Sequence, residues 1–356
     1  MNVDWSLNII QQGATVRESL KRLNTISEIL PVRPLTLFVE DENRRIVGTL
    51  SGGDIRRYLV ENGSILDAPV KLFMNREFTF IRDGIESYPE IKTCFRKGIE
   101  LLPVLNERGE LVRIYDLNYT RAILPVHGVI MAGGEGMRLR PLTTDTPKPM
   151  LKIGEKPIIE RNVDQMTRFG ISDLTISVRY LGQQIVDHFG NGKFRGIQIN
   201  YVKEEEPLGT LGSVSLIDNI ARDHVLLMNS DILSTINLET FYDDFVSRNA
   251  DMSVVTVPYK IKLPYAVLET NDEIITGLRE KPEFVHYMNA GIYLIRRELL
   301  RNLEPGARMD TTDFIEDMIR NGARVVSYPF WGYWLDIGNH EDFVNAQRTI
   351  KILDDE

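Results

Sequence analysis

The sequence of 356 residues is almost free of cysteine. Its single cysteine, Cys94, excludes an intrachain disulfide and a cysteine-rich metal site. No apolar run approaches the roughly 18–20 residues of a membrane span. The first residues lack the basic and apolar regions of a secretory signal. We therefore expect a cytoplasmic protein that does not associate with membranes.

Positive charge is also in short supply, with 42 Lys and Arg against 51 Asp and Glu, for a formal net charge of −9. General binding to nucleic acid requires a surplus of basic side chains that contact phosphates, so nucleic acid is not an expected partner. The five histidines show no ligand-like spacing. A content of 43% hydrophobic and 26% charged residues is typical of globular proteins, and the length predicts two domains.

The two expected domains comprise residues 1–120 and 126–356. The first contains an internal echo, because residues 37–48 and 102–112 each read as a strand, a polar turn and a second strand. Such a repeat predicts a pair of like α+β modules that pack on each other. The junction, residues 121–125, contains no Gly or Ser, and we expect a short, semi-rigid linker.

Strands alternate with helices from residue 126 onwards. Between the first two strands, Ile159, Val163 and Met166 follow helical spacing, and Gly170 marks the helix end. This alternation predicts an α/β domain with a Rossmann-like, mostly parallel sheet, whose ligands lie at the carboxyl ends of the strands. The expected strands are residues 126–131, 174–178, 197–202, 225–228, 253–257, 292–295 and 325–328.

A glycine-rich segment follows the first of these strands, with Gly133, Gly134 and Gly136 preceding Arg138. Glycines let the backbone approach a ligand and point N–H groups at phosphate oxygens. The segment is not a P-loop, and Leu139 stands where a dinucleotide fingerprint has its third glycine. On the glycines alone, a phosphate-binding loop and an ordinary strand-to-helix turn are both open.

A second motif, Pro147-Lys148-Pro149-Met150-Leu151, follows the glycines. Together, G-G-x-G-x-R-L-x-P-L-T and P-K-P-M-L resemble the signature of the sugar-1-phosphate nucleotidylyltransferases. Similar segments continue through residues 225–231, 279–293 and 334–338, so that the resemblance covers about residues 126–352. Two positions depart from the family pattern: Met137 replaces a common Thr or Ser, and Ala266 replaces a usual Gly near the sugar.

The resemblance implies the attack of a sugar-1-phosphate on the α-phosphate of a nucleoside triphosphate. The attacking phosphate is mostly a dianion at pH 7, so no general base is needed. Catalysis then consists of positioning and charge stabilisation. By resemblance, Arg138, Lys148 and Lys281 are catalytic, and Asp231 and Asp336 hold Mg²⁺. The implied contacts to the nucleotide and the sugar phosphate come from Ala132, Gly133, Gly134, Gly136, Met137, Glu204 and Gly209, and from Glu280 and Asn289, respectively. Taken singly, either Asp could instead cap a turn or helix.

The choice of base depends on residues 203–212, where three Glu precede Pro207. Guanine presents two adjacent donors, N1–H and N2–H, which a carboxylate accepts together, whereas uracil and thymine place one donor between two acceptors. Glu204 therefore predicts GTP as the substrate. The alternative is that the three Glu form a solvated run.

The front domain resembles a tandem of CBS modules. The similarity lies in residues 39–55, where Gly48, Ser51 and Asp54 match the G-x-x-[ST]-x-x-D motif for adenosyl ligands. This implies an adenine nucleotide at Ser51 and Asp54. The second repeat has Asp116 and Tyr119 and lacks the motif. A structural or dimerising module is the alternative to a nucleotide sensor.

These inferences lead to a CBS-fronted guanylyltransferase that makes a GDP-sugar of the GDP-glucosamine type for bacterial surface-glycan (nonulosonate) biosynthesis. Mannose- and heptose-1-phosphate guanylyltransferases are close alternatives. A non-catalytic, nucleotide-sensing regulatory protein is the alternative from another class. We expect GTP and a sugar-1-phosphate as ligands, and a homo-oligomer formed through CBS or transferase surfaces.

Overall fold

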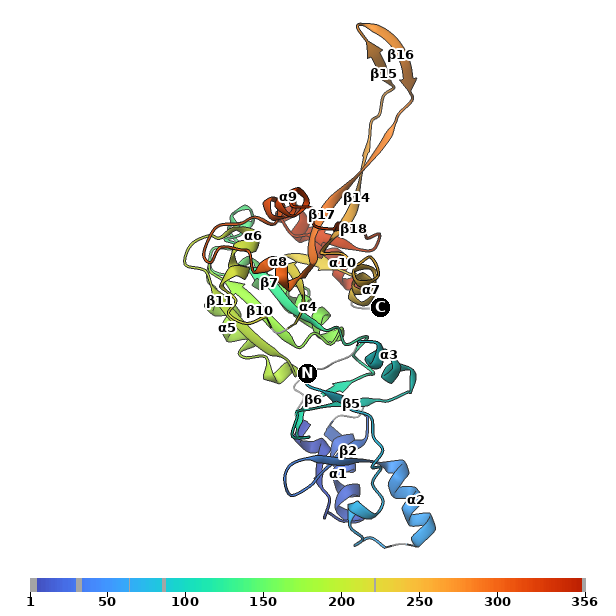
Figure 1. The fold of residues 1–356 in the computed structure, drawn as a ribbon. Helices are drawn as coiled ribbons and strands as arrows, with labels where there is room; N and C mark the ends of the chain where they lie inside the picture. The colour runs from blue at the N-terminus through green and yellow to red at the C-terminus, as the bar shows by residue number, and fades with distance from the viewer. Residues whose placement is uncertain (1–4, 30–33, 64, 85–87, 221, 354–356) are drawn as a thin grey trace. The chain divides into compact units, whose positions relative to one another are not determined.

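The computed structural model describes residues 5–29, 34–63, 65–84, 88–220 and 222–353. The chain divides into two compact units (Figure 1). Unit 1 comprises Met1–Pro125, Thr167–Ile171 and Gly192–Gln198, and unit 2 comprises Val126–Met166, Ser172–Asn191 and Ile199–Glu356. Within the described ranges, no helix is both long and apolar enough to cross a membrane.

Unit 1 contains two three-stranded sheets with the same pattern of pairing. In the sheet of order β1-β2-β3, β1 and β2 are parallel and β2 and β3 antiparallel, and β4, β5 and β6 repeat this arrangement. The elements are η1 (Trp5–Asn8), β1 (Ile9–Gln11), α1 (Val16–Ile29), β2 (Thr36–Glu40), β3 (Ile46–Ser51), α2 (Gly52–Asn62), η2 (Val70–Leu72), β4 (Ile81–Arg82), α3 (Tyr88–Arg96), β5 (Leu101–Leu105) and β6 (Leu111–Asp116).

Helix α2 begins where the sequence placed the CBS ligand motif. The Ser51 hydroxyl accepts a hydrogen bond from the Asp54 N–H, while the Asp54 carboxylate accepts hydrogen bonds from the Ser51 N–H at 2.8 Å and from the Ser51 hydroxyl at 2.6 Å. Arg57 forms an ion pair with the same carboxylate. Together Ser51 and Asp54 make a capping box that satisfies the first N–H groups of the helix.

Unit 2 is built on a seven-stranded sheet of order β11-β10-β7-β12-β17-β14-β18. The seven strands are those that the hydrophobic pattern predicts. Strand β17 runs antiparallel to both of its neighbours, whereas β10, β7 and β12 are mutually parallel and β14 is parallel to β18. The strands are β7 (Val126–Ala132), β10 (Asp173–Val178), β11 (Gln198–Lys203), β12 (His224–Asn229), β14 (Met252–Lys262), β17 (Glu283–Arg296) and β18 (Val325–Pro329).

Side chains that alternate along these strands face opposite sides of the sheet. On one side, Val129, Leu227 and Tyr293 join a buried cluster with Leu211 and Phe314 from the covering helices. The helices of unit 2 are α4 (Ile158–Arg168), whose last two residues fall in unit 1, α5 (Gln183–Phe189), α6 (Gly209–Gly212), α7 (Leu238–Ser247), α8 (Arg297–Leu300), α9 (Thr311–Arg320) and α10 (His340–Leu353). The predicted helix is α4, whose Ile159, Val163 and Met166 are buried.

The remaining elements of unit 2 are short, with one exception. They are η3 (Met137–Leu139), η4 (Lys148–Met150), β8 (Lys152–Ile153), β9 (Lys156–Pro157), η6 (Ser213–Leu216), β13 (Ile232–Ser234) and β19 (Trp334–Asp336), and η5 (Lys193–Arg195) lies in a segment of unit 1. The exception is a hairpin of β15 (Val267–Asn271) and β16 (Ile274–Arg279). Figure 1 shows this hairpin at the far end of a ribbon formed by β14 and β17, which rises out of the sheet.

Candidate active site

A cavity of about 370 Å³ lies where β7, β10 and β12 end. Gly133, Arg179 and Ser230 follow these strands directly and line the cavity. Because the three strands are parallel, their carboxyl ends meet at one edge of the sheet. The lining also contains most of the predicted site residues: Gly134, Gly136, Met137, Arg138, Lys148, Glu204, Gly209 and Asp231.

The glycine-rich loop packs tightly against the segment that carries Lys148. Gly136 has a φ of 62°, and a Cβ atom there would lie 2.9 Å from the Cβ atom of Lys148. The buried Thr143 hydroxyl donates a hydrogen bond of 2.9 Å to the Gly136 carbonyl. A side chain at position 136 would therefore separate the loop from Lys148, which explains why the turn uses glycine.

Strands β13 and β19 bring the two predicted metal ligands together. In this antiparallel pair, Ile232 lies opposite Asp336, and the N–H of Ile337 donates a hydrogen bond of 3.0 Å to the Asp231 carbonyl. The Asn162 side chain on α4 donates to the Ser230 carbonyl at 3.2 Å and holds the same turn. Asp231 thus follows a central strand, while Asp336 arrives from a segment more than one hundred positions later in the sequence.

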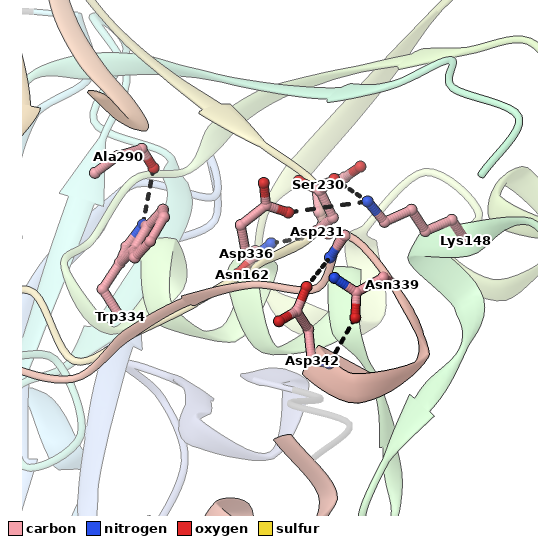
Figure 2. A network of polar contacts seen from close by, with 10 residues as sticks. Lys148, Asn162, Ser230, Asp231, Ala290, Trp334, Asp336, Asn339 and Asp342 are labelled. Atoms are coloured by element: carbon pink, nitrogen blue, oxygen red, sulfur yellow. Dashed lines mark hydrogen bonds and ion pairs between the residues drawn. The ribbon is translucent and has the colours of Figure 1, made fainter. Parts of the chain in front are cut away.

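The ammonium of Lys148 points toward both carboxylates (Figure 2). Its ammonium forms an ion pair with Asp231 and lies 3.9 Å from Oδ1 of Asp336, and its side chain is only 11% exposed. Burial and the negative charge of Asp231 raise the pKa of Asp336, while Lys148 and Arg138 act in the opposite direction. The cluster places both signs of charge at the cavity.

The donor set at this point suits a hard cation. One oxygen of each carboxylate, Oδ1 of Asp231 and Oδ1 of Asp336, is buried and accepts no hydrogen bond. Mg²⁺ takes carboxylate oxygens together with waters and phosphate oxygens, so two carboxylates fit an ion that the substrates help to hold. No group of three or more His, Cys, Asp or Glu suited to a metal was found among the described residues.

Glu204 is buried at the wall of the cavity, with 5% of its surface exposed. Its Oε1 accepts a hydrogen bond of 2.6 Å from the Ser177 hydroxyl, and its Oε2 accepts one of 3.3 Å from the Leu208 N–H. A Cβ atom on Gly133 would lie 2.6 Å from Oε1. A solvated run is therefore wrong for Glu204, although its neighbours Glu205 and Glu206 are exposed.

The loop after Glu204 is fixed by a second close approach. Gly209 has a φ of 78°, and a Cβ atom there would lie 2.6 Å from Oδ1 of Asp310. The same Oδ1 accepts a hydrogen bond of 3.2 Å from the Thr210 N–H. Asp310, which lines the cavity, was not singled out from the sequence, because it belongs to no recognisable motif.

Arg179 is another lining residue that the sequence analysis missed. Its guanidinium donates hydrogen bonds of 3.2 Å to the Gly133 carbonyl and to the Glu135 carboxylate, and so ties β10 to the glycine-rich loop. Its position directly after a predicted strand was the signal that could have revealed it. Ser177 carried a weaker signal, since it lies inside the same strand.

The structure does not bring every predicted residue to the cavity. Ala132 is buried at the end of β7, and Asp336 is in reach of Lys148 without lining the cavity. The predicted sugar-phosphate residues Glu280 and Asn289, together with Lys281, are exposed and are not among the lining residues. Glu280 and Lys281 lie between β16 and β17, and Asn289 lies on β17 where its buried part begins.

The fold and the cavity define an α/β domain with a glycine-rich phosphate loop, paired basic and acidic side chains, and a buried carboxylate. The family described as nucleotidyl transferase matches residues 127–352. The chain therefore belongs to the nucleotidyl transferase family.

Relatives agree with this assignment, and a solved structure shares the fold. The mannose-1-phosphate guanylyltransferase of Mycobacterium tuberculosis is 30% identical over 231 residues, which are 63% of this chain and 64% of that protein. The D-glycero-alpha-D-manno-heptose 1-phosphate guanylyltransferase of Aneurinibacillus thermoaerophilus is 28% identical over 233 residues, covering 64% of this chain and 99% of that one. A Bacillus anthracis structure assigned as a glucose-1-phosphate thymidylyltransferase has a TM-score of 0.51 at 23% identity, over 63% of this chain and 94% of that chain, and shares the fold.

The matches leave part of the relatives unaccounted for. The match spans 64% of the length of the Mycobacterium tuberculosis protein and 62% of the length of a mannose-1-phosphate guanyltransferase from Schizosaccharomyces pombe. The residues matched by the family model begin and end within unit 2, so the match gives no information on residues 1–120.

Proposed function

We propose that the chain is a sugar-1-phosphate guanylyltransferase, which joins GTP and a sugar-1-phosphate into a GDP-sugar and releases pyrophosphate. The observation that carries the proposal is the grouping of the glycine-rich loop, Arg138, Lys148, Asp231 and Glu204 around one cavity. The printed activities of the mannose- and heptose-1-phosphate guanylyltransferase relatives support the same reaction.

In this proposal each group handles charge on the reacting phosphates. The loop N–H groups and Arg138 hold the triphosphate, and Lys148 leaves its ion pair with Asp231 to contact phosphate oxygens. Asp231 and Asp336 would hold Mg²⁺, which neutralises negative charge on the phosphates when it is bound. Lys281, Glu280 and Asn289 do not line the cavity of this conformation. We propose that they contact the sugar phosphate when they are brought to such a cavity. The remaining loop contacts, Ala132, Gly133, Gly134, Gly136, Met137 and Gly209, are proposed to surround the nucleotide.

The choice of GTP depends on the lone pairs of Glu204. Each carboxylate oxygen has two acceptor sites, and the protein uses one on each, from Ser177 and Leu208. The second site on each oxygen remains for the N1–H and N2–H donors of guanine. A pyrimidine base would place a carbonyl oxygen against the carboxylate and leave buried charge unpaired.

For the sugar, we propose glucosamine-1-phosphate and the GDP-glucosamine step of legionaminic acid biosynthesis, with mannose- and heptose-1-phosphate as the alternatives. The test is pyrophosphate release with GTP, Mg²⁺ and each of these sugar phosphates. Turnover of one of them with GTP, and far less with UTP or dTTP, is the expected result. Tight binding of GTP without pyrophosphate release from any pair would instead support the nucleotide-sensing alternative. Asp231→Asn serves as the inactive control.

For unit 1, we propose a CBS-type pair that binds an adenine nucleotide at Ser51 and Asp54. The shared pairing pattern of its two sheets supports a duplicated module. Because both residues cap helix α2, a nucleotide would have to accept the same geometry or displace it. Calorimetric titration of the full chain with AMP, ADP and ATP tests this. Binding that Asp54→Ala abolishes is expected, and no binding below millimolar would leave a purely structural or dimerising unit.

A further inference from the structure

The most unusual feature of unit 2 is the arm, which we define as residues 258–288. The pairing of β14 with β17 runs from Met252 opposite Ile295 to Lys262 opposite Glu283. Along β14 the first six residues are buried and most of the rest are exposed, and along β17 the first seven are exposed. The two strands therefore leave the sheet as a ribbon, which the hairpin of β15 and β16 extends (Figure 1).

The arm carries far more apolar surface than a solvated ribbon requires. Twelve large apolar side chains between Tyr259 and Met288 are 36–79% exposed, including Tyr265, Ile274 and Leu278. Monomeric proteins rarely expose contiguous apolar surface of this kind unless a partner covers it. A two-stranded ribbon without a covered face is also marginally stable in water. Another surface must therefore pack on the arm.

The arm does not turn back toward its own cavity. The ladder between β14 and β17 continues to its end, and Glu283 accepts ion pairs from Lys260 at 3.1 Å and from Lys262 at 3.3 Å. Beyond it, the Leu263 N–H donates to the Pro282 carbonyl at 3.1 Å. In this conformation the lining of the cavity contains no residue of the chain's own arm.

The cavity, for its part, lacks the cation that the arm carries. Lys281 is exposed on the arm, whereas the cavity has to bind two polyanions beside Asp231, Asp336 and Asp310. The arm also leaves the sheet at the edge where the cavity opens, because β14 runs in the same direction as β7 and β12. A second copy of the chain would offer a surface that covers the apolar side chains of the arm. It would also offer a cavity to which the arm could add Lys281.

We propose that two copies of this chain exchange arms, so that the arm of each copy covers the cavity of the other and supplies Lys281 to it. An exchange of this kind is isologous and closes into a two-fold dimer. The assignment of Lys281 to a phosphate rests on the proposed function, whereas the association of the arms does not. The two parts are therefore tested by different measurements.

The association is tested by sedimentation of the full chain. The double variant Ile275→Glu and Leu278→Glu places charge on the exposed face of the arm and should halve the mass of the assembly. Ile319→Glu, which changes an equally exposed residue on α9, is the matched control and should leave the mass unchanged. A monomeric wild-type chain, or an arm variant with the mass of the wild type, would overturn the proposal.

The shared site is tested by co-expressing two inactive variants, Lys281→Ala and Asp231→Asn. In a mixed dimer, the intact arm of the Asp231→Asn chain enters the intact cavity of the Lys281→Ala chain. Half of the dimers are mixed and each has one complete site, so about a quarter of the wild-type activity should return. Activity no greater than the sum of the two variants would show that each arm serves its own chain. If the wild type itself has no turnover, the proposed function fails, and the sedimentation result still decides the association.

Discussion

The substitution Glu204→Gln tests the proposed base recognition most directly. It replaces a carboxylate by an amide of the same shape, at a residue that is 5% exposed and packed against Gly133. One end of the new side chain carries two donors and no longer accepts. The amide oxygen can still accept the Leu208 N–H, and the Ser177 hydroxyl can reverse and accept from the amide nitrogen. The fold therefore tolerates the change.

The substitution should affect the binding of guanine more than it affects the fold. One of the two base donors meets the amide nitrogen, so one charge-assisted hydrogen bond is lost. Such a bond contributes about 1.5–3 kcal/mol, which corresponds to a loss of about 10- to 150-fold in kcat/KM for GTP. Turnover of UTP should change much less, because uracil does not use the same pair of acceptors. The ratio of GTP to UTP turnover should fall by nearly the whole factor.

The assay is pyrophosphate release at varied GTP and UTP, together with the thermal midpoint Tm. Glu205→Gln is the matched control, since it makes the same chemical change at an exposed neighbour and should alter neither quantity. A lower Tm with an unchanged GTP-to-UTP ratio would refute the reasoning. Glu204 would then only hold the loop through Ser177 and Leu208, and another group would read the base.

Further expectations concern the proposed metal site and the pH dependence of stability. Asp231→Asn and Asp336→Asn should each lower kcat by roughly 10²- to 10³-fold and weaken the response to added Mg²⁺; near-normal turnover would remove that residue from the metal site. Burial lowers the pKa of His127, with Arg222 acting in the same direction and Asp173 against it. In the unfolded chain His127 binds a proton at about pH 6.5, whereas in the folded chain it stays neutral to lower pH. The free energy of unfolding therefore decreases as the pH falls through this range. The drop in Tm between pH 7.5 and 5.5 should be smaller in His127→Gln than in the wild type, and equal drops would contradict this.

Much of unit 2 is predictable because its sheet is buried on both faces. The seven apolar segments expected from the sequence are the seven strands of the sheet, and the helix containing Ile159 and Val163 is α4. The direction of β17 was harder to predict from the sequence. A mostly parallel sheet follows from the alternation of strands and helices, but β17 is reached from β14 through a long hairpin and must run antiparallel to it.

Part of the site was predictable from two contiguous motifs, whereas Glu280, Lys281 and Asn289, which also belong to family-like segments, do not line the cavity. The glycine-rich loop, Arg138 and Lys148 lie in such motifs, and all of them line the cavity. Asp310 and Ser177 do not, because their relation to the site arises from contacts with Gly209 and Glu204 across the fold. Such long-range contacts leave no local pattern in the sequence.

The arm shows a different limit of sequence reasoning. Residues at the end of β14 and directly after it read Tyr259-Lys260-Ile261-Lys262-Leu263. Apolar and charged side chains alternate here, which predicts a strand with one covered face. The pattern is the same whether a helix of the same chain or a second molecule provides the cover. The continuous pairing with β17 leaves these side chains exposed, and this exposure is the basis for proposing a second molecule as the cover.

The charged cluster around Lys148 links stability to the proposed chemistry. A buried ion pair gains little net stability, because desolvation offsets most of the attraction, whereas an unpaired buried charge is costly. Lys148 faces two carboxylates, so Asp231→Asn leaves it with Asp336 and also removes the repulsion that raises the pKa of Asp336. The fold should therefore survive the loss of one carboxylate even though catalysis does not. Two carboxylates around one lysine are more than the fold requires. In the proposed function both would be needed, because Asp231 and Asp336 would hold Mg²⁺ and Lys148 would contact phosphate oxygens.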